Sequence, residues 1–148
     1  PLLATPYNEG WPALSPDGRW LAYQSDESGQ AEVYVRAFRG SGAKVIVSQN
    51  GGAEPVWSRD GRELFYRGVG PQGTPLIATT LQTTPELRVL SRTPLFDLGE
   101  YEGATPHANF DIAPDGRNFV MVHQGKLSEI VMVQNWTEDV RRLSAAPR

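Results

Sequence analysis

The feature that most constrains the fold is a short turn motif that occurs three times along the chain. The sequence reads Ser-Pro-Asp-Gly-Arg at 15–19, Ser-Arg-Asp-Gly-Arg at 58–62 and Ala-Pro-Asp-Gly-Arg at 113–117. Proline presets φ at the second turn position, Asp can bond its own backbone two residues on, and glycine suits the fourth position of a type I turn. Each motif is therefore interpreted as a turn between strands, with repeated cation binding by the aspartates as the alternative. The structural turn residues are Asp17, Gly18, Asp60, Gly61, Asp115 and Gly116.

The spacing of these turns predicts a repeated all-β unit. The aspartates lie 43 and 55 residues apart, and a four-stranded propeller blade takes roughly 40–50 residues. The longer second interval is assigned to an insertion around 96–106. Alternating patterns rich in β-branched and aromatic residues mark the strands between the turns. The predicted strands are 11–15, 19–25, 31–38 and 43–48, then 54–58, 62–67, 75–81 and 87–91, and finally 108–113, 117–123 and 128–135.

The two ends of the sequence do not complete this repeat evenly. Residues 1–5 resemble a lone outer strand, because similar apolar runs precede the second and third units. The sequence therefore contains one strand before the first unit, four strands in each of the first two units and three in the last. Together these twelve strands would make three antiparallel four-stranded blades, but the ends of the sequence do not coincide with the ends of the blades. We expect a single domain over 1–148, with blade one at 11–48, blade two at 54–91 and an incomplete blade three at 108–135. The remaining segment, 136–148, is expected to be a C-terminal cap with a helical pattern at 137–143.

Composition and charge argue against several classes of partner. The net charge is −3 and no basic cluster exceeds Arg141-Arg142, so nucleic acid is not an expected partner. The chain has no cysteine and two histidines, which excludes a thiolate or three-histidine metal site within one chain. No apolar run approaches the roughly 18 residues of a membrane helix, and the first residues lack a signal-peptide pattern. We expect no metal and no membrane insertion.

A glycine-rich segment at 68–73 matches Gly-x-Gly-x-x-Gly. A dinucleotide site requires a helix to start after such glycines. Here Pro71 and a strand-like run follow. The segment is interpreted as a hairpin loop, and no cofactor is expected.

Three segments together resemble a known family. NEGWPALSPDGRWLAYQSDESGQAEVYVRAF, GGAEPVWSRDGRELFY and IVMVQNWTEDVRRL are similar to the Pro-Asp-Gly repeats of TolB-like, WD-like β-propellers. More narrowly, they resemble the last three blades of the propeller domain that follows some bacterial serine/threonine kinase domains. The resemblance implies a six-bladed ring of which this chain would form half, an interaction role, and a periplasmic or extracytoplasmic location. No kinase motif of the His-Arg-Asp or Asp-Phe-Gly type is present.

Candidate ligand-binding residues precede the innermost strand of each unit. In the aligned units these positions hold Glu9, Trp11, Glu54, His107 and Asn109, which in a propeller would border the mouth of the channel. This set could contact a polar ligand, with ordinary solvation of loops as the alternative. Catalysis would require an acid and a base that converge with shifted pKa values. We therefore predict that none of these residues is catalytic.

Half a ring would expose apolar blade faces at both ends and one strand edge, which favours association. We predict a head-to-tail homodimer that closes six blades, in which residues 1–5 of each chain add a strand to 117–135 of the other. The predicted function is a non-catalytic interaction or scaffold module that binds a protein, peptide or small polar ligand at the channel mouth. Two alternatives remain: a structural half-propeller that only self-assembles, and a hydrolase or lyase that uses the mouth carboxylates and His107.

Overall fold

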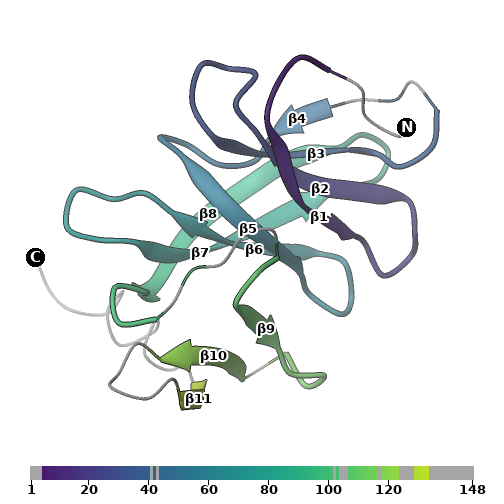
Figure 1. Ribbon diagram of the computed structural model, residues 1–148. Coiled ribbons are helices and arrows are strands. Elements are labelled where there is room, and N and C mark those ends of the chain that lie inside the picture. The colour runs from purple at the N-terminus through teal and green to yellow at the C-terminus, as the bar shows by residue number, and fades with distance from the viewer. Residues whose placement is uncertain are drawn as a thin grey trace, which may run out of the picture.

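The computed structural model describes residues 5–40, 42, 44–101, 103, 107–116, 118–123 and 129–133 (Figure 1). Within these residues, eleven strands form three sheets of four, four and three strands. Every pairing between neighbouring strands is antiparallel. The all-β prediction with three antiparallel blades is therefore confirmed.

The strands of each blade follow one another in sequence. Blade one has the order β1-β2-β3-β4 and blade two the order β5-β6-β7-β8, while blade three contains β9, β10 and β11 with β10 in the middle. The bounds are β1 (Glu9–Leu14), β2 (Trp20–Ser25), β3 (Glu32–Ala37), β4 (Lys44–Ile46), β5 (Gly52–Trp57), β6 (Glu63–Gly68), β7 (Pro75–Gln82), β8 (Arg88–Asp97), β9 (Phe110–Ile112), β10 (Phe119–His123) and β11 (Glu129–Val133).

Two strand boundaries differ from the sequence prediction in an informative way. The strand β8 continues to Asp97 instead of ending at 91, so the insertion starts later than expected. Its last part stays in the sheet because Leu95 is buried and Phe96 packs on Phe119 with ring centroids 6.0 Å apart. The strand β9 is only three residues long, and Tyr101 forms a β-bridge with His123 at the far end of β10. Tyr101, from the insertion, thus pairs with β10 at a position where the alignment had placed the predicted innermost strand, 108–113.

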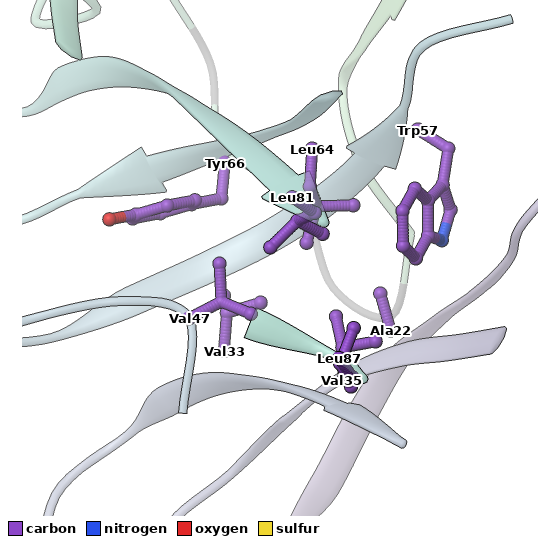
Figure 2. Close-up of a cluster of buried hydrophobic side chains, with 9 residues drawn as sticks. All are labelled: Ala22, Val33, Val35, Val47, Trp57, Leu64, Tyr66, Leu81 and Leu87. Atoms are coloured by element: carbon purple, nitrogen blue, oxygen red, sulfur yellow. The ribbon is translucent and has the colours of Figure 1, made fainter. Parts of the chain in front are cut away.

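The first interblade core lies between blades one and two (Figure 2). Successive side chains of a strand point to opposite faces, so one face of β2 and β3 supplies apolar residues while blade two supplies the opposing set. The Trp57 indole Nε1 also donates a hydrogen bond of 3.1 Å to the Ala13 carbonyl across this contact. The buried members are Ala22, Val33, Val35, Val47, Trp57, Leu64, Tyr66, Leu81 and Leu87.

The second interblade core joins blade two to blade three. Its aromatic part centres on Phe119 of β10, which makes an edge-to-face contact with Phe65 of β6 at 5.0 Å. Edge-to-face pairs of this kind add to the stabilisation from buried area. The buried members are Phe65, Leu76, Ala78, Leu95, Leu98, Phe110, Phe119 and Met121.

Two predicted end segments fall mostly or wholly outside the residues that the structure describes. These are the outer strand expected at 1–5, of which only Thr5 is described, and the C-terminal segment 136–148. The described part of the chain contains no helix long and apolar enough to cross a membrane.

Candidate functional site

The most enclosed of the predicted mouth residues is Glu54, which is 2% exposed. Its Oε1 accepts a hydrogen bond of 2.9 Å from Arg67 Nε, and its Oε2 accepts one of 3.0 Å from the backbone amide of Asn109. The Arg67 side chain is itself only 14% exposed. Both carboxylate oxygens are therefore engaged, and they join β5 to β6 and to the segment that leads into β9.

The backbone explains why this side chain turns inward. The pairing of β5 with β6 shifts register between Ala53 and Val56, and Glu54 adopts the left-handed conformation with φ 55°. The equivalent shift in blade one lies between Gly10 and Ala13, where Trp11 has φ 49°. A bulge of this kind re-aims a side chain out of the regular alternation of a strand.

The other predicted mouth residues are placed differently. Glu9 is exposed and accepts a hydrogen bond of 2.8 Å from Thr5 Oγ1. His107 is exposed, with Nδ1 3.4 Å from the Ala108 carbonyl, and Trp11 is half-buried. Only Asn109 meets Glu54, and it does so through its backbone. In the described part of the chain, neither Glu9 nor His107 forms a hydrogen bond or ion pair with Glu54.

The sequence analysis did not identify two polar residues that form hydrogen bonds inside the fold. One is the half-buried Arg67, which lies at the end of the predicted strand 62–67. The other is Glu32, which is 5% exposed and accepts hydrogen bonds from the Gly51 amide at 3.0 Å and from Ser48 Oγ. A signal for Arg67 was present, because in a β5–β6 hairpin it lies beside the strand that carries Glu54. No comparable signal marked Glu32.

The aspartates of the first two turns accept hydrogen bonds from their own turns, and Asp115 of the third turn accepts one of 2.8 Å from Asn118 Nδ2. Asp17 Oδ1 accepts hydrogen bonds from Ser15 Oγ at 2.6 Å and from the backbone amide two residues on at 3.0 Å. Asp60 repeats both contacts, with Ser58 Oγ at 2.8 Å and the corresponding amide at 3.1 Å. The described residues contain no group of three His, Asp or Glu side chains placed to hold a metal ion. These contacts favour the structural role of the motif.

The pH dependence of stability tests the structural role of Asp17 in the first turn. The hydrogen bond from Ser15, followed by that from the Arg19 amide, lowers the pKa of Asp17 below its ordinary value of 3.8. A lowered folded-state pKa contributes stability above the unfolded pKa, and that stability is lost as the pH falls through the folded pKa. We expect Asp17→Asn to cost less than about 1 kcal/mol at pH 7, because solvent screens this carboxylate.

Thermal unfolding of both proteins at pH 7 and pH 3 measures the effect. The difference in melting temperature between the unmodified protein and Asp17→Asn should be smaller at pH 3 than at pH 7. Glu86→Gln serves as the matched control, because Glu86 is an exposed carboxylate outside any turn motif. A difference that is equal at both pH values would contradict the assigned role.

Three hollows of the described surface lie away from the predicted mouth residues. One of them measures about 470 Å³ and lies beside the loop between β6 and β7, against the end of β8. Smaller ones of about 300 and 290 Å³ lie beside the first turn and between the second and third turns. None of the three is lined by a predicted mouth residue.

Solved structures with a similar fold include several propeller proteins. TolB from Acinetobacter baumannii matches with a TM-score of 0.52 and 15% identity, over 90% of this chain and 43% of that protein. A protein from Agrobacterium tumefaciens that bears the TolB name matches at 0.57 and 18%, over 90% and 60%. An oligogalacturonate lyase from Vibrio parahaemolyticus matches at 0.59 and 17%, over 82% and 32%.

These likenesses concern the fold. No protein-family model matches the sequence, and no curated protein matches it. The chain spans less than two thirds of each of the three proteins named. The chain therefore has a fold of β-propeller blades that resembles TolB. The resemblance lies in the three blades, their order and their antiparallel strands.

Proposed function

We propose that the chain is a non-catalytic β-propeller module that acts by binding, with a protein or peptide partner at the channel mouth. The observation that carries the proposal is the state of Glu54. Both of its carboxylate oxygens accept hydrogen bonds from within the fold, one from Arg67 and one from the Asn109 amide. A carboxylate held in this way fastens blade two to blade three, which supports a structural role for Glu54 within the mouth.

The remaining mouth residues suit contact with a polypeptide. Glu9 and His107 are exposed, and Trp11 is half-buried. They offer a carboxylate, an imidazole and an indole, which can form hydrogen bonds and aromatic contacts with a bound chain. Interfaces commonly combine aromatic residues with a polar rim.

The enzymatic alternative has less support from the contacts of the mouth residues. A hydrolase or lyase would need an acid and a base close to the same reacting atom. Neither Glu9 nor His107 forms a hydrogen bond or ion pair with Glu54 in the described part of the chain. The similarity to an oligogalacturonate lyase, at 17% identity, supports a shared fold. We propose binding without turnover as the role that these contacts support better.

Selection from a phage-displayed library of random peptides tests this proposal. Peptides selected on the unmodified protein should bind the double variant Glu9→Gln/His107→Ala at least about tenfold more weakly. Leu90→Ala is the matched control, because Leu90 is 59% exposed on β8 and away from the mouth residues in sequence; it should bind the peptides as the unmodified protein does.

Two results would contradict a binding role at the mouth. One is selected peptides that bind the double variant as tightly as the unmodified protein. The other is turnover of a polysaccharide, ester or peptide substrate by the unmodified protein that His107→Ala abolishes. If no peptide is selected and no turnover occurs, the proposal fails, and the result favours the alternative of a purely structural half-propeller.

A further inference from the structure

Blade two departs from the repeat in two places that lie next to each other. The loop between β6 and β7 reads Val-Gly-Pro-Gln-Gly-Thr at 69–74, where the corresponding loop of blade one reads Asp-Glu-Ser-Gly-Gln-Ala at 26–31. The outer strand β8 has ten residues and ends at Asp97, whereas its counterpart β4 has three. The loop and the end of β8 together line the hollow of about 470 Å³.

The walls of this hollow are mostly apolar. They include the rings of Pro71, Pro75, Pro94 and Phe96. Ligand sites commonly measure roughly 300–1,000 Å³, so the hollow is large enough for one side chain of a partner. Its described lining residues include no lysine or arginine, and the charged residue among them is Asp97. The hollow therefore combines an apolar surface with a single negative charge.

The Asp97 carboxylate is oriented by the backbone around it. Its Oδ1 accepts hydrogen bonds from the amides of Thr74 at 3.1 Å and Gly99 at 2.9 Å. Within the described part of the chain, Oδ2 accepts no hydrogen bond and Asp97 forms no ion pair. Because Asp97 is also exposed, its Oδ2 is an acceptor of fixed position that a ligand can reach.

Gly73 allows the carboxylate to lie against the loop. A Cβ atom at this position would collide with Asp97 Oδ2, and the backbone there has φ 151°. Glycine avoids both the collision and the conformational penalty. A side chain at 73 would displace the carboxylate without removing its charge, so position and charge can be tested separately.

The hollow lies at the same end of blade two as the start of β5, although no predicted mouth residue lines it. Gly68, just before the loop, pairs with Gly52, the first residue of β5. Glu54 follows on the same strand, where its carboxylate is held inside the fold. A partner that approaches this end of the molecule would therefore meet the hollow as a contact separate from the mouth.

We propose that this hollow binds the side chain of a lysine on a peptide or protein partner. The aliphatic stem would contact the proline rings and Phe96, and the ammonium would donate a hydrogen bond to Asp97 Oδ2. Lysine side chains commonly bury the stem on apolar surface and keep the charged end at a polar group. The site goes beyond the proposed mouth site, because the two have no residue in common.

The geometry of the carboxylate favours lysine over arginine. A guanidinium is a planar fork that matches two acceptor oxygens, whereas an ammonium is a compact point charge. Oδ1 of Asp97 already accepts two hydrogen bonds from the backbone. Oδ2 alone is left for the ligand, which suits the ammonium.

Titration of isotope-labelled protein with Nα-acetyl-lysine amide, followed by NMR, tests the site. The amides of 69–74 and of the end of β8 should shift, with a dissociation constant in the millimolar range, as expected for so small a ligand. The Nε-acetylated form of the probe lacks the charge and should bind at least about tenfold more weakly. Nα-acetyl-arginine amide should bind about threefold more weakly than the lysine probe.

Three variants separate the parts of the site. Asp97→Asn removes the charge but keeps an oxygen for the two amide hydrogen bonds, and it should weaken binding of the lysine probe at least about tenfold. Gly73→Ala keeps the charge but displaces it, and should weaken binding by a similar factor. Glu100→Gln is the matched control, because the Glu100 side chain is 85% exposed and does not line the hollow; it should bind the probe as the unmodified protein does. Unchanged amide signals in blade one should show that each variant keeps its fold.

Several outcomes would overturn the inference. These are a probe that shifts no amide beside the hollow, equal binding of the Nε-acetylated probe, tighter binding of the arginine probe, and normal binding by a folded Asp97→Asn or Gly73→Ala variant. Equal losses in Asp97→Asn and Glu100→Gln would also overturn it, because they would indicate attraction by the general charge of the surface.

The mouth and the hollow can fail independently. The double variant Glu9→Gln/His107→Ala should bind the lysine probe as the unmodified protein does, since neither residue lines the hollow. Weaker binding of the probe by this variant would contradict a separate site. The peptide selection decides the binding role of the mouth in either case.

Discussion

Replacement of Phe119 by alanine should lower the free energy of unfolding by about 3–5 kcal/mol, the usual cost of removing a buried phenylalanine side chain. Phe119 is 0% exposed. Its ring meets Phe65 at 5.0 Å, Phe96 at 6.0 Å and Phe110 at 6.4 Å, so it contacts three strands besides its own. Alanine would leave a cavity in the middle of the second interblade core, and the strands of two blades cannot all move to fill it.

Urea denaturation followed by tryptophan fluorescence measures this loss. All samples need the same protein concentration, because association adds to apparent stability. Tyr7→Ala is the control: Tyr7 is an aromatic residue that is 46% exposed, and its removal should cost well under about 1 kcal/mol. Equal costs for the two variants would show that blade three does not depend on the described core.

Replacement of Glu54 by alanine is the second change with a large expected effect. It would remove the carboxylate that accepts a hydrogen bond from the Arg67 guanidinium, and the Arg67 side chain is 14% exposed. Removal of one member of a buried ion pair commonly costs about 3–5 kcal/mol, because the remaining charge stays out of water. The variant would also lose the acceptor of the Asn109 amide, which links blade three to blade two.

A second substitution separates the charge from the rest of the effect. The double variant Glu54→Leu/Arg67→Leu removes both charges and should recover part of the lost stability, as measured by the same denaturation. Glu86→Ala supplies the control, because the Glu86–Arg88 pair is about two thirds exposed on both sides and should contribute less than about 1 kcal/mol. If Glu54→Ala lowers the free energy of unfolding no more than Glu86→Ala does, the hydrogen bonds of Glu54 do not hold blade two to blade three.

The repeat made much of the fold predictable from the sequence. The three Asp-Gly turns set the register, and the alternating patterns between them located the strands to within a few residues. The exception was β8, because its extension to Asp97 depends on the contact between Phe96 and Phe119. Residues that contact each other between blades are far apart in the sequence, so local sequence patterns do not predict these contacts.

The candidate site was less predictable. Alignment placed Glu54 at the channel mouth, but its burial follows from a bulge with φ 55° at a residue other than glycine. No local signal marks such a conformation at glutamate. The sequence analysis predicted apolar blade faces at the ends of a half-ring, but it did not single out Ile130 and Met132, which look like ordinary strand residues and are 80% and 54% exposed.

The mass of the unmodified protein in solution tests the predicted head-to-tail homodimer most directly. Light scattering should give twice the chain mass of 16.3 kDa at micromolar concentration. A mass of 16.3 kDa at every concentration up to the limit of solubility would contradict it.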